Sequence, residues 1–335
     1  MSEETRYIFS KGDLSRKDFS ICFRKEQGLI YLPIKNTKEL YCFNDINLST
    51  KLLEVLSKSG IIMHFFGYYG NYIGTFYPKE HLMSGRVVIE QALTYNNHEK
   101  RMQIAKAIIG GIADNIYFTL YHYYRHGKTE LKEYLDWLRV DTKDMLHKVD
   151  NIKQLLAVEG EIWARFYASF QYFLPDNFIM DKRIKRPPDN PMNAMISFGN
   201  TLLYTKTVSQ LYETHLDQSI SFLHEPMERR FSLSLDISEV FKPIIVFKTI
   251  FECVNNRKIT IEKHFDKKMN YALLNDLGRR VFVEEFENRI NNVYEHTKLK
   301  RKITYKNSIK LDGYKLIKYI MEGGKFTPFS IENGQ

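Results

Sequence analysis

Glu159, His224, Asp236 and Glu239 are the residues of this sequence whose types and spacing could do chemistry together. Asp236 and Glu239 are three residues apart, so a helix presents both on one flank. His224 precedes Asp236 by twelve residues, which is enough chain for a loop to fold back onto the start of that helix. Carboxylate oxygens combined with an imidazole are the ligand set that holds Mg²⁺ or Mn²⁺ in enzymes acting on phosphates. The four residues therefore predict metal-dependent chemistry.

Each of these residues alone also has a structural interpretation. Glu159 lies within an apolar helical stripe, where an ionised carboxylate carries a large desolvation cost unless it gains a cation or its pKa rises. A buried salt bridge to an arginine of another helix would meet the same need. Asp236 and Glu239 could be first-turn acids that favour the helix dipole, with His224 an ordinary loop histidine. Only their joint occurrence on a basic chain makes metal binding an equal alternative. The stripe consists of Ile152, Leu155, Leu156, Ile162, Trp163, Phe166 and Phe170.

The composition of the chain bounds its class. Its 335 residues and 44% hydrophobic content describe a folded protein, for which two domains is the better expectation. Three scattered cysteines form no metal-spaced pair and indicate a reducing cytosol. The polar N-terminus shows no signal peptide, and no apolar run reaches the length of a membrane span, so we expect a cytoplasmic protein without a membrane partner. The formal net charge of +9 favours a polyanionic partner.

Basic residues accompany the acidic cluster along the chain. Some crowd a proline-rich connector at 181–190, and others lie between His224 and Asp236 or follow Glu239. Such groups would neutralise phosphates beside a metal, as a nuclease or strand-transfer site requires. For the run Lys298, Lys300, Arg301 and Lys302 we expect a solvated face instead. The residues that we expect to contact DNA are Arg165, Arg183, Arg186, Arg229, Arg230 and Lys242.

The elements that must position these residues change type once along the chain. Before about Tyr77, apolar residues occur in short β-rich runs, and one short helix is expected from Ser49 to Ser57 with Ser49 as its cap. Turn signals include Gly12-Asp13. The expected strands are 6–9, 19–23, 29–32, 40–43, 61–66 and 72–77. The aromatic run from His64 to Tyr72 could stack bases or form a hydrophobic dimer surface.

Beyond Pro78 and the Ser84-Gly85 pair, nearly everything has helical periodicity. Because Pro243 has no N–H, the carbonyl of Glu239 loses its usual partner, and we expect its helix to bend there. The sequence predicts an α+β protein, with a small β-rich domain at 1–80 followed by a larger all-α catalytic domain at 81–335. The expected helices are 86–93, 100–124, 131–149, 152–173, 191–215, 232–251, 274–292 and 306–321.

Several stretches together resemble one known family. In order, and over essentially the full length, they resemble the CRISPR-associated "Cas one" family, the integrase and endonuclease of spacer acquisition, in its type I-B branch. The stretches are His64-Phe65-Phe66-Gly67-Tyr68-Tyr69-Gly70, Leu156-Ala157-Val158-Glu159-Gly160, Arg186-Pro187-Pro188, Asn193-Ala194-Met195-Ile196-Ser197-Phe198-Gly199-Asn200, Phe222-Leu223-His224-Glu225-Pro226, Arg230-Phe231-Ser232-Leu233-Ser234-Leu235-Asp236 and Phe241-Lys242-Pro243.

The resemblance implies a site, an assembly and a reaction. It assigns Glu159, His224 and Glu239 as ligands of Mg²⁺ or Mn²⁺, with Asp236 as a supporting residue or a candidate for a second metal. It implies a homodimer formed through the β-rich domain, with two dimers flanking a dimer of the small partner "Cas two". The expected reaction is attack of a prespacer 3′-hydroxyl on a phosphodiester at the edge of a CRISPR repeat, with double-stranded and branched DNA as substrates.

Two departures from the family pattern and two alternatives remain. Gln218 stands where the family usually has proline, and Phe247-Lys248 replaces a common Asp-Arg pair, so local helix packing and one supporting ion pair are in question. A structure-selective nuclease acting on branched DNA would use the same residues without needing a repeat sequence. A non-catalytic DNA-binding scaffold would need neither Glu159 nor a divalent metal.

Overall fold

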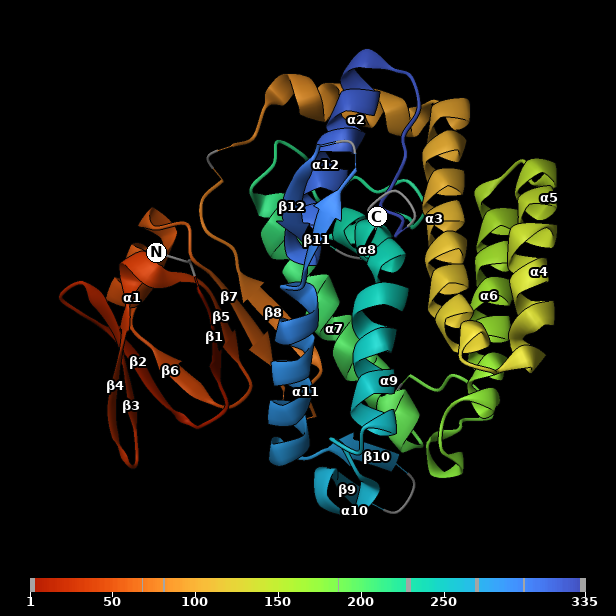
Figure 1. Ribbon diagram of the computed structural model, residues 1–335. Coiled ribbons are helices and arrows are strands. Elements are labelled where there is room, and N and C mark those ends of the chain that lie inside the picture. The colour runs from red at the N-terminus through yellow and green to blue at the C-terminus, as the bar shows by residue number, and fades with distance from the viewer. Residues whose placement is uncertain are drawn as a thin grey trace. The chain divides into compact units, whose positions relative to one another are not determined.

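The computed structural model shows two compact units, Met1–His81 and Leu82–Gln335 (Figure 1). The first unit is built mainly from strands and the second mostly from helices. This confirms the predicted α+β class, in which a β-rich region precedes a larger helical one. The residues described by the structure are 4–67, 69–80, 82–185, 187–226, 230–268, 271–297 and 299–331.

Two four-stranded sheets form the first unit. One sheet has the order β1-β5-β7-β8, in which β1, β5 and β7 are parallel and β8 is antiparallel to β7. The other has the order β4-β3-β2-β6. One apolar core holds residues from both sheets and from α1, among them Leu14, Leu40, Leu52 and Met63. The strands are β1 Glu4–Ile8, β2 Gly12–Lys17, β3 Ser20–Lys25, β4 Gly28–Pro33, β5 Thr37–Cys42, β6 Ile46–Leu48, β7 Ile62–Phe66 and β8 Tyr72–Phe76.

The short helix of this unit, α1 (Thr50–Lys58), begins where the sequence predicts. The Ser49 hydroxyl accepts a hydrogen bond from the N–H of Leu52 at 3.3 Å, which satisfies one of the free donors of the first turn. Leu52 and Leu56 are fully buried in the core, as their helical spacing requires.

Two strands of the first unit, β2 and β6, were not predicted. The turn expected at Gly12-Asp13 is instead the start of β2. A Cβ on Gly12 would lie 2.2 Å from the carbonyl oxygen of Arg24, so only glycine fits there. This glycine marks a close backbone approach inside a sheet rather than a turn.

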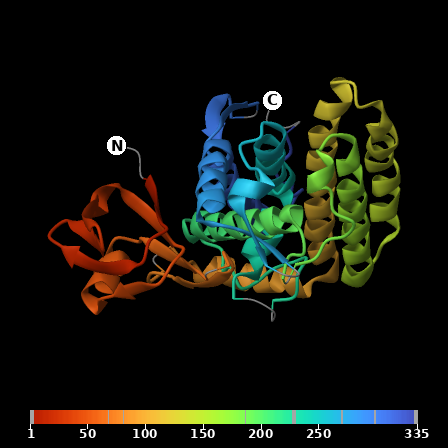
Figure 2. The same cartoon turned by 90° about the horizontal axis from the view of Figure 1, so that it is seen from below.

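The second unit packs helices around the long, buried helix α7. Asn190 caps α7 and Pro191 begins it, which is the position where proline is best tolerated. The helix α3 packs against α4, α6 and α8, and Figure 2 shows α3 to α6 side by side. The helices are α2 Gly85–Asn96, α3 His98–Arg125, α4 Lys132–Arg139, α5 Asp141–Lys148, α6 Ile152–Ala168, α7 Pro191–Tyr212, α8 Ser232–Phe241, α9 Lys248–Asn255, α10 Ile261–His264, α11 Asp276–Ile290 and α12 Tyr305–Glu322.

The structure corrects several details of this helical region. The helix expected at 131–149 is broken between α4 and α5, and α6 ends in a short 3₁₀ turn, Ser169–Tyr172. Leu156, which we placed in the buried stripe, is 37% exposed. The all-α expectation also missed two hairpins, formed by β9 (Phe265–Lys268) with β10 (Tyr271–Leu274) and by β11 (Val293–His296) with β12 (Arg301–Thr304).

Two features expected from composition and proline content can be compared directly. The described residues of the connector at 181–190 form no regular helix, as its prolines require. Among the described residues, no helix has the length and apolar character needed to cross a membrane.

Candidate metal-dependent active site

The helix that carries two of the four candidate residues is interrupted just after them. The helix α8 ends at Phe241, a π-helical turn spans Pro243–Phe247, and α9 follows. The Asn115 side chain on α3 donates to the carbonyl of Val240 at 2.9 Å, which satisfies an acceptor beside the irregular turn. Where we expected a bend at Pro243, the structure has a π turn, a feature common at functional sites.

The position of Asp236 and Glu239 in α8 excludes one of the structural interpretations. The helix begins at Ser232 and has no acid in its first turn. Asp236 lies in its middle and Glu239 near its end, where a negative charge gains nothing from the positive N-terminal end of the dipole. Other interactions must therefore account for these two buried carboxylates.

Asp236 organises the segment that carries His224. Its Oδ2 accepts hydrogen bonds from the N–H groups of Phe222 at 2.7 Å and Leu223 at 2.9 Å. Its Oδ1 accepts from the N–H of His224 at 3.0 Å and faces the Nδ1 of the same residue at 2.7 Å. The carboxylate is fully buried, and four donors converge on it. This geometry supports the interpretation of Asp236 as a supporting residue.

The opposite side of the same segment is held by α2 and α3. Arg101 donates from Nε to the carbonyl of Phe222 at 2.9 Å and from Nη2 to Glu225 at 2.8 Å. Tyr95 donates its hydroxyl to the other oxygen of Glu225 at 3.0 Å, and the Arg101 guanidinium lies over the Tyr95 ring. The hydrogen bond from Arg101 lowers the pKa of Glu225, although burial opposes this shift, and so keeps the carboxylate charged. The His224 segment is thus fixed from two sides.

This arrangement determines which nitrogen of His224 is available. A carboxylate can only accept a hydrogen bond, so the Nδ1 of His224 carries the proton toward Asp236 and leaves Nε2 as the nitrogen able to bind a metal. Burial alone would lower the pKa of His224, but the hydrogen bond to Asp236 and the charges of Asp236, Glu239 and Glu159 raise it overall. A carboxylate behind the ring is the usual partner of a metal-binding histidine.

Glu239 has one satisfied oxygen and one unsatisfied oxygen. Its Oε1 forms an ion pair with Lys242, one turn further along the chain, and the Lys242 ammonium lies 5.8 Å from the centre of the Trp163 ring. Its Oε2 is buried and has no hydrogen-bond partner in the described part of the chain. An unpaired buried carboxylate oxygen is costly, and such an oxygen in a native structure calls for an explanation.

Glu159 faces the same space from α6. Its Oε1 accepts a hydrogen bond from the Trp163 indole N–H at 3.3 Å. Burial raises the pKa of Glu159, the charge of Glu239 raises it further, and Lys242 and His224 oppose the shift. The charge of Glu239 therefore acts on Glu159, as expected when two carboxylates face the same space.

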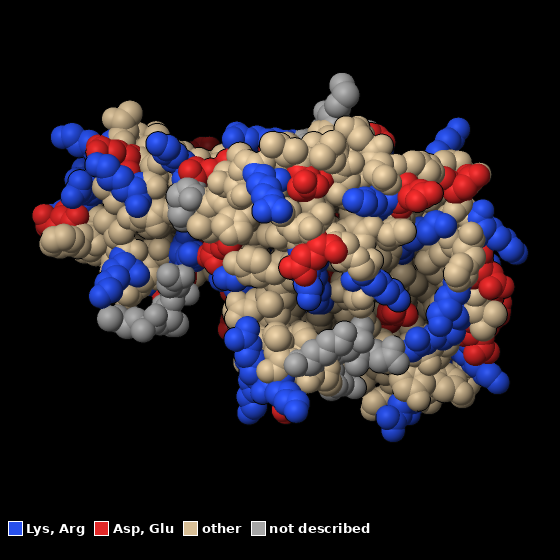
Figure 3. All heavy atoms as spheres, turned by 90° about the horizontal axis from the view of Figure 1, so that it is seen from above, with Lys and Arg blue, Asp and Glu red and all other residues tan. Residues whose placement is uncertain are grey.

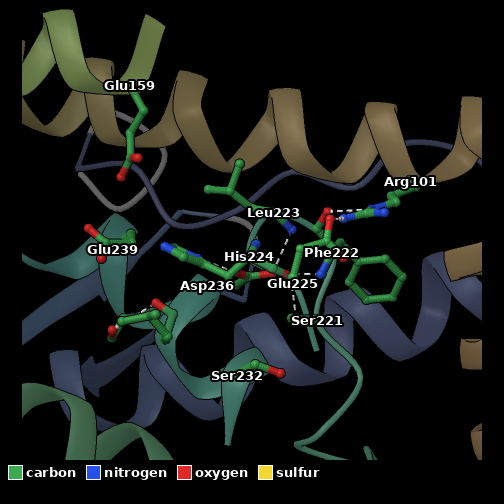
Figure 4. Close-up of polar contacts among 12 residues, drawn as sticks. Arg101, Glu159, Ser221, Phe222, Leu223, His224, Glu225, Ser232, Asp236 and Glu239 are labelled. Carbon is green, nitrogen blue, oxygen red and sulfur yellow. Dashed lines mark hydrogen bonds and ion pairs between the residues drawn. The ribbon is translucent and has the colours of Figure 1, made fainter. Parts of the chain in front are cut away.

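The three side chains point toward one another without forming a complete coordination shell. Figure 4 shows Glu159, the ring of His224 and Glu239 converging from α6, from the 221–225 segment and from α8. No group of three His, Cys, Asp or Glu side chains in the described ranges is already gathered closely enough to hold a metal. The donor types, the free Oε2 of Glu239 and the orientation of His224 nevertheless fit a hard divalent cation. Glu239 would have to turn from Lys242 toward that cation.

The basic residues expected to contact DNA differ in their surroundings. Arg183 is half-buried and donates to the side chains of Asn193 at 3.0 Å and Ser197 at 2.8 Å, so its donors are already used inside the protein. Arg165 pairs with Glu161 at 3.2 Å and lies over the Trp137 ring of α4. Arg230 is exposed. Arg186 and Arg229 lie outside the described residues.

Sequence reasoning missed Arg101, Tyr95 and Glu225. Glu225 follows His224 directly, and its charge in that segment was the available signal. Nothing in the linear spacing connects it to Arg101, which lies 124 positions away. Only the packing of α3 beside the His224 segment brings this pair together.

The two departures from the family pattern have local consequences. Gln218 donates to the carbonyl of Val208 at 3.1 Å and accepts from the hydroxyl of Ser234, so it joins the end of α7 to α8. Burial, with a smaller contribution from Arg289, lowers the pKa of Lys248 to about 8. Gln218 therefore supports helix packing, whereas Lys248 stands in a site unfavourable to its charge.

Known proteins match this chain over nearly its whole length. The sequence model of the family described as "CRISPR associated protein Cas1" matches residues 6–288. A relative from Thermodesulfovibrio yellowstonii, named CRISPR-associated endonuclease Cas1 2, is 40% identical over 328 residues, which are 98% of this chain and 98% of the relative.

Two solved structures have the same fold. A CAS1 protein from Thermotoga maritima has a TM-score of 0.86 at 37% identity and covers 96% of this chain and 99% of its own. A casposase bound to integration product has a TM-score of 0.85 at 20% identity and covers 100% of this chain and 96% of its own. The range matched by the family model contains all four candidate residues.

Proposed function

The chain belongs to the CRISPR-associated Cas1 family, and from this premise we propose that it is a metal-dependent DNA endonuclease and integrase of CRISPR adaptation. Its reaction would insert prespacer DNA into the CRISPR array. The prespacer 3′-oxygen forms a bond to phosphorus at the edge of a repeat, and the bond from that phosphorus to the 3′-oxygen of the repeat strand breaks. With water as the nucleophile, the same site would cut DNA.

Glu159, His224 and Glu239 are the proposed ligands of Mg²⁺ or Mn²⁺. The observation that carries this proposal is the buried Oε2 of Glu239, which has no protein partner in the described part of the chain. A bound divalent cation would lower the pKa of the attacking hydroxyl and polarise the scissile phosphate. Asp236 acts on the ring of His224 rather than on the cation, because its oxygens already accept bonds from the 222–224 segment.

Lys242 and the basic residues nearby would assist the chemistry electrostatically. In the absence of a cation, Lys242 neutralises Glu239. Once Glu239 turns to a metal, the ammonium is free to offset negative charge that builds on the phosphoryl oxygens in the transition state. Arg229 and Arg230 precede α8 and would add positive charge beside the substrate.

The proposed assembly is a homodimer that works with the small Cas2 partner. The β-rich unit supplies a suitable edge, since β4 ends its sheet and carries exposed Leu29, Ile30 and Tyr31. An exposed apolar edge strand is a ready template for pairing with another chain. We assign dimerisation to the β-rich domain and catalysis to the helical one. The type I-B branch stays a prediction from the sequence motifs.

The test is strand transfer from a labelled branched DNA into a repeat-containing target, with Mn²⁺, Mg²⁺ or EDTA. Glu159→Gln should abolish metal-dependent product. Glu161→Gln is the matched control, because Glu161 lies on the same helix and pairs with Arg165 outside the cluster. Product that survives Glu159→Gln would contradict the proposed site.

The alternatives are separated by two changes to the same assay. Equal transfer into repeat and scrambled targets would favour a structure-selective nuclease acting on branched DNA. Tight DNA binding with no product under any metal, even with the partner added, would favour a non-catalytic scaffold.

A further inference from the structure

The hairpin of β11 and β12 carries a cluster of positive charge that the proposed site does not use. A hydrogen bond from the N–H of Lys300 to the carbonyl of His296, 2.8 Å long, closes its turn. Lys300, Arg301 and Lys302 occupy the end of the turn and the start of β12, and all three are exposed. We call these three residues the hairpin cations. Figure 1 shows the hairpin in blue beside α12.

The hairpin cations form no ion pair with the described residues of the protein. Glu295 lies directly opposite Lys302 in the strand register, yet no ion pair joins them. Throughout the described part of the second unit, no carboxylate lies within ion-pair distance of Lys300, Arg301 or Lys302. Three adjacent like charges that form no ion pair with the described residues favour an external anionic partner.

Lys300 also occupies a backbone conformation that does not suit its type. Its φ is +46°, in the left-handed region where an L side chain is disfavoured and glycine is relaxed. Hairpin turns of this kind usually place glycine there. A lysine at this position carries a backbone cost, and its side chain forms no hydrogen bond or ion pair with the described residues.

The hairpin is anchored to the helix of the candidate site. The Tyr294 hydroxyl is hydrogen-bonded to Ser308 at 2.7 Å, and the Tyr294 ring lies 5.9 Å from that of Phe329. Phe329 stacks on Phe241 at 5.0 Å, and Phe241 is the last residue of α8, two positions after Glu239. Phe329 therefore lies between Tyr294 of the hairpin and the helix that carries Glu239, and contacts both.

We propose that the hairpin cations bind the phosphate backbone of duplex DNA, as a second contact separate from the candidate metal ligands. The inference rests on the proposed function, because it takes DNA as the substrate of this chain. It replaces our sequence-based expectation of a merely solvated face. The hairpin would hold the DNA in place and would not take part in bond cleavage.

The chemistry of the hairpin cations favours DNA over an acidic protein. Lysine is depleted at protein–protein interfaces, where it must be desolvated. Phosphate contacts, in contrast, use exposed Lys and Arg and need no matched directional partner. In Figure 3, Lys and Arg are scattered over the visible face with acids among them, so net charge alone does not locate a DNA path. The hairpin is distinguished by three adjacent cations that form no ion pair with the described residues.

The test measures the affinity of the full-length protein for a duplex of arbitrary sequence as a function of NaCl concentration. Lys300→Gly should reduce the slope of log K against log [salt] by about 0.9, the value for one lost phosphate contact. Arg301→Gln combined with Lys302→Gln should reduce it by about twice that amount. Lys300→Gly should also raise the melting temperature, since glycine relaxes the turn.

Arg257→Gly is the matched control, because Arg257 is also exposed, has a φ of +53° and lies outside the hairpin. It should raise the melting temperature similarly while leaving the salt slope unchanged. If both hairpin variants fold and keep the salt slope of the wild type, the inference is wrong.

Failure of the inference and failure of the proposed function give different results. Wild-type protein that binds duplex DNA but transfers no strand contradicts the proposed function. The salt slopes of the hairpin variants then still show whether the hairpin cations contact DNA. Strand transfer with unchanged slopes contradicts only the hairpin contact. Wild-type protein that binds no DNA overturns both.

Discussion

The two carboxylates of α8 lie one turn apart and have opposite surroundings. Both carboxylate oxygens of Asp236 accept hydrogen bonds from the 222–224 segment. The donors are three backbone N–H groups and the ring of His224. Glu239 has a buried oxygen that is unpaired among the described residues, and a second oxygen that is paired only with Lys242. The first carboxylate is built for structure, and the second retains capacity for a ligand.

This difference indicates how the proposed metal site would be prepared before a metal binds. The His224 segment is fixed from both sides, by Asp236 and by Arg101, so the ring needs little reorganisation. Glu159 and Glu239 repel one another and are only partly compensated. A cation placed between them would remove that repulsion. In the proposed site, the rigid part would orient His224, and the two carboxylates would provide the affinity for the cation.

The largest expected effect comes from Glu239→Gln. We expect metal-dependent strand transfer to fall by more than about 100-fold, since losing a direct ligand should exceed the 10–100-fold cost of losing an outer partner. Urea unfolding should move little, because the amide oxygen can still accept from Lys242. Isothermal titration measures the affinity for Mn²⁺, and the transfer assay measures the loss of activity. A variant that binds Mn²⁺ normally would remove Glu239 from the site.

Asp236→Ala, unlike Glu239→Gln, should cause a large loss of stability. It leaves several buried donors without an acceptor, and each costs about 1–3 kcal/mol, so urea unfolding should show a loss of at least about 3 kcal/mol. Asp217→Ala is the control, because among the described residues its carboxylate accepts only from the partly exposed Ser219. Similar losses in both variants would contradict the special role of Asp236.

Arg101→Gln should weaken the second support of the His224 segment. Its partner Glu225 is 55% exposed, so solvent screens the pair, and we expect a loss of about 1 kcal/mol in unfolding free energy. Mn²⁺ affinity should fall several-fold because His224 becomes less well oriented. Arg139→Gln, which removes an arginine that lies over Tyr117, should leave Mn²⁺ affinity unchanged. Equal Mn²⁺ affinity in the two variants would show that Arg101 does not position His224.

The smallest expected effect is a pH dependence in the metal-free protein. Burial and Glu239 raise the pKa of Glu159, so the folded state binds that proton more tightly than the unfolded state. Its contribution to stability is full below the unfolded pKa of about 4.3 and is lost as pH rises through the higher folded pKa. Relative to Glu159→Gln, the wild type should therefore lose stability between acidic and neutral pH. Saturating Mn²⁺ should reverse the trend, because a cation favours the charged carboxylate.

Residue types and short-range patterns were enough to predict much of the secondary structure. Periodicity predicted the β-rich region, the helices that carry Glu159 and Glu239, and the Ser49 cap, because these depend on neighbours within one or two turns. Proline chemistry predicted that the helix is disturbed at Pro243, as a bend, and the structure shows the disturbance as a π turn. The same local reasoning failed at Gly12, whose requirement comes from a neighbouring strand, and at the β11–β12 hairpin, which is short and polar.

What the linear order left open was the division of roles between Asp236 and Glu239. Both are acids on one flank of one helix, and no local property separates them. The structure separates them because the 222–224 backbone folds onto Asp236, while Glu239 faces Glu159 from another helix. The same holds for Arg101, whose partner lies 124 residues away. Ligand choice and orientation depend on contacts between distant segments, and only tertiary packing determines those contacts.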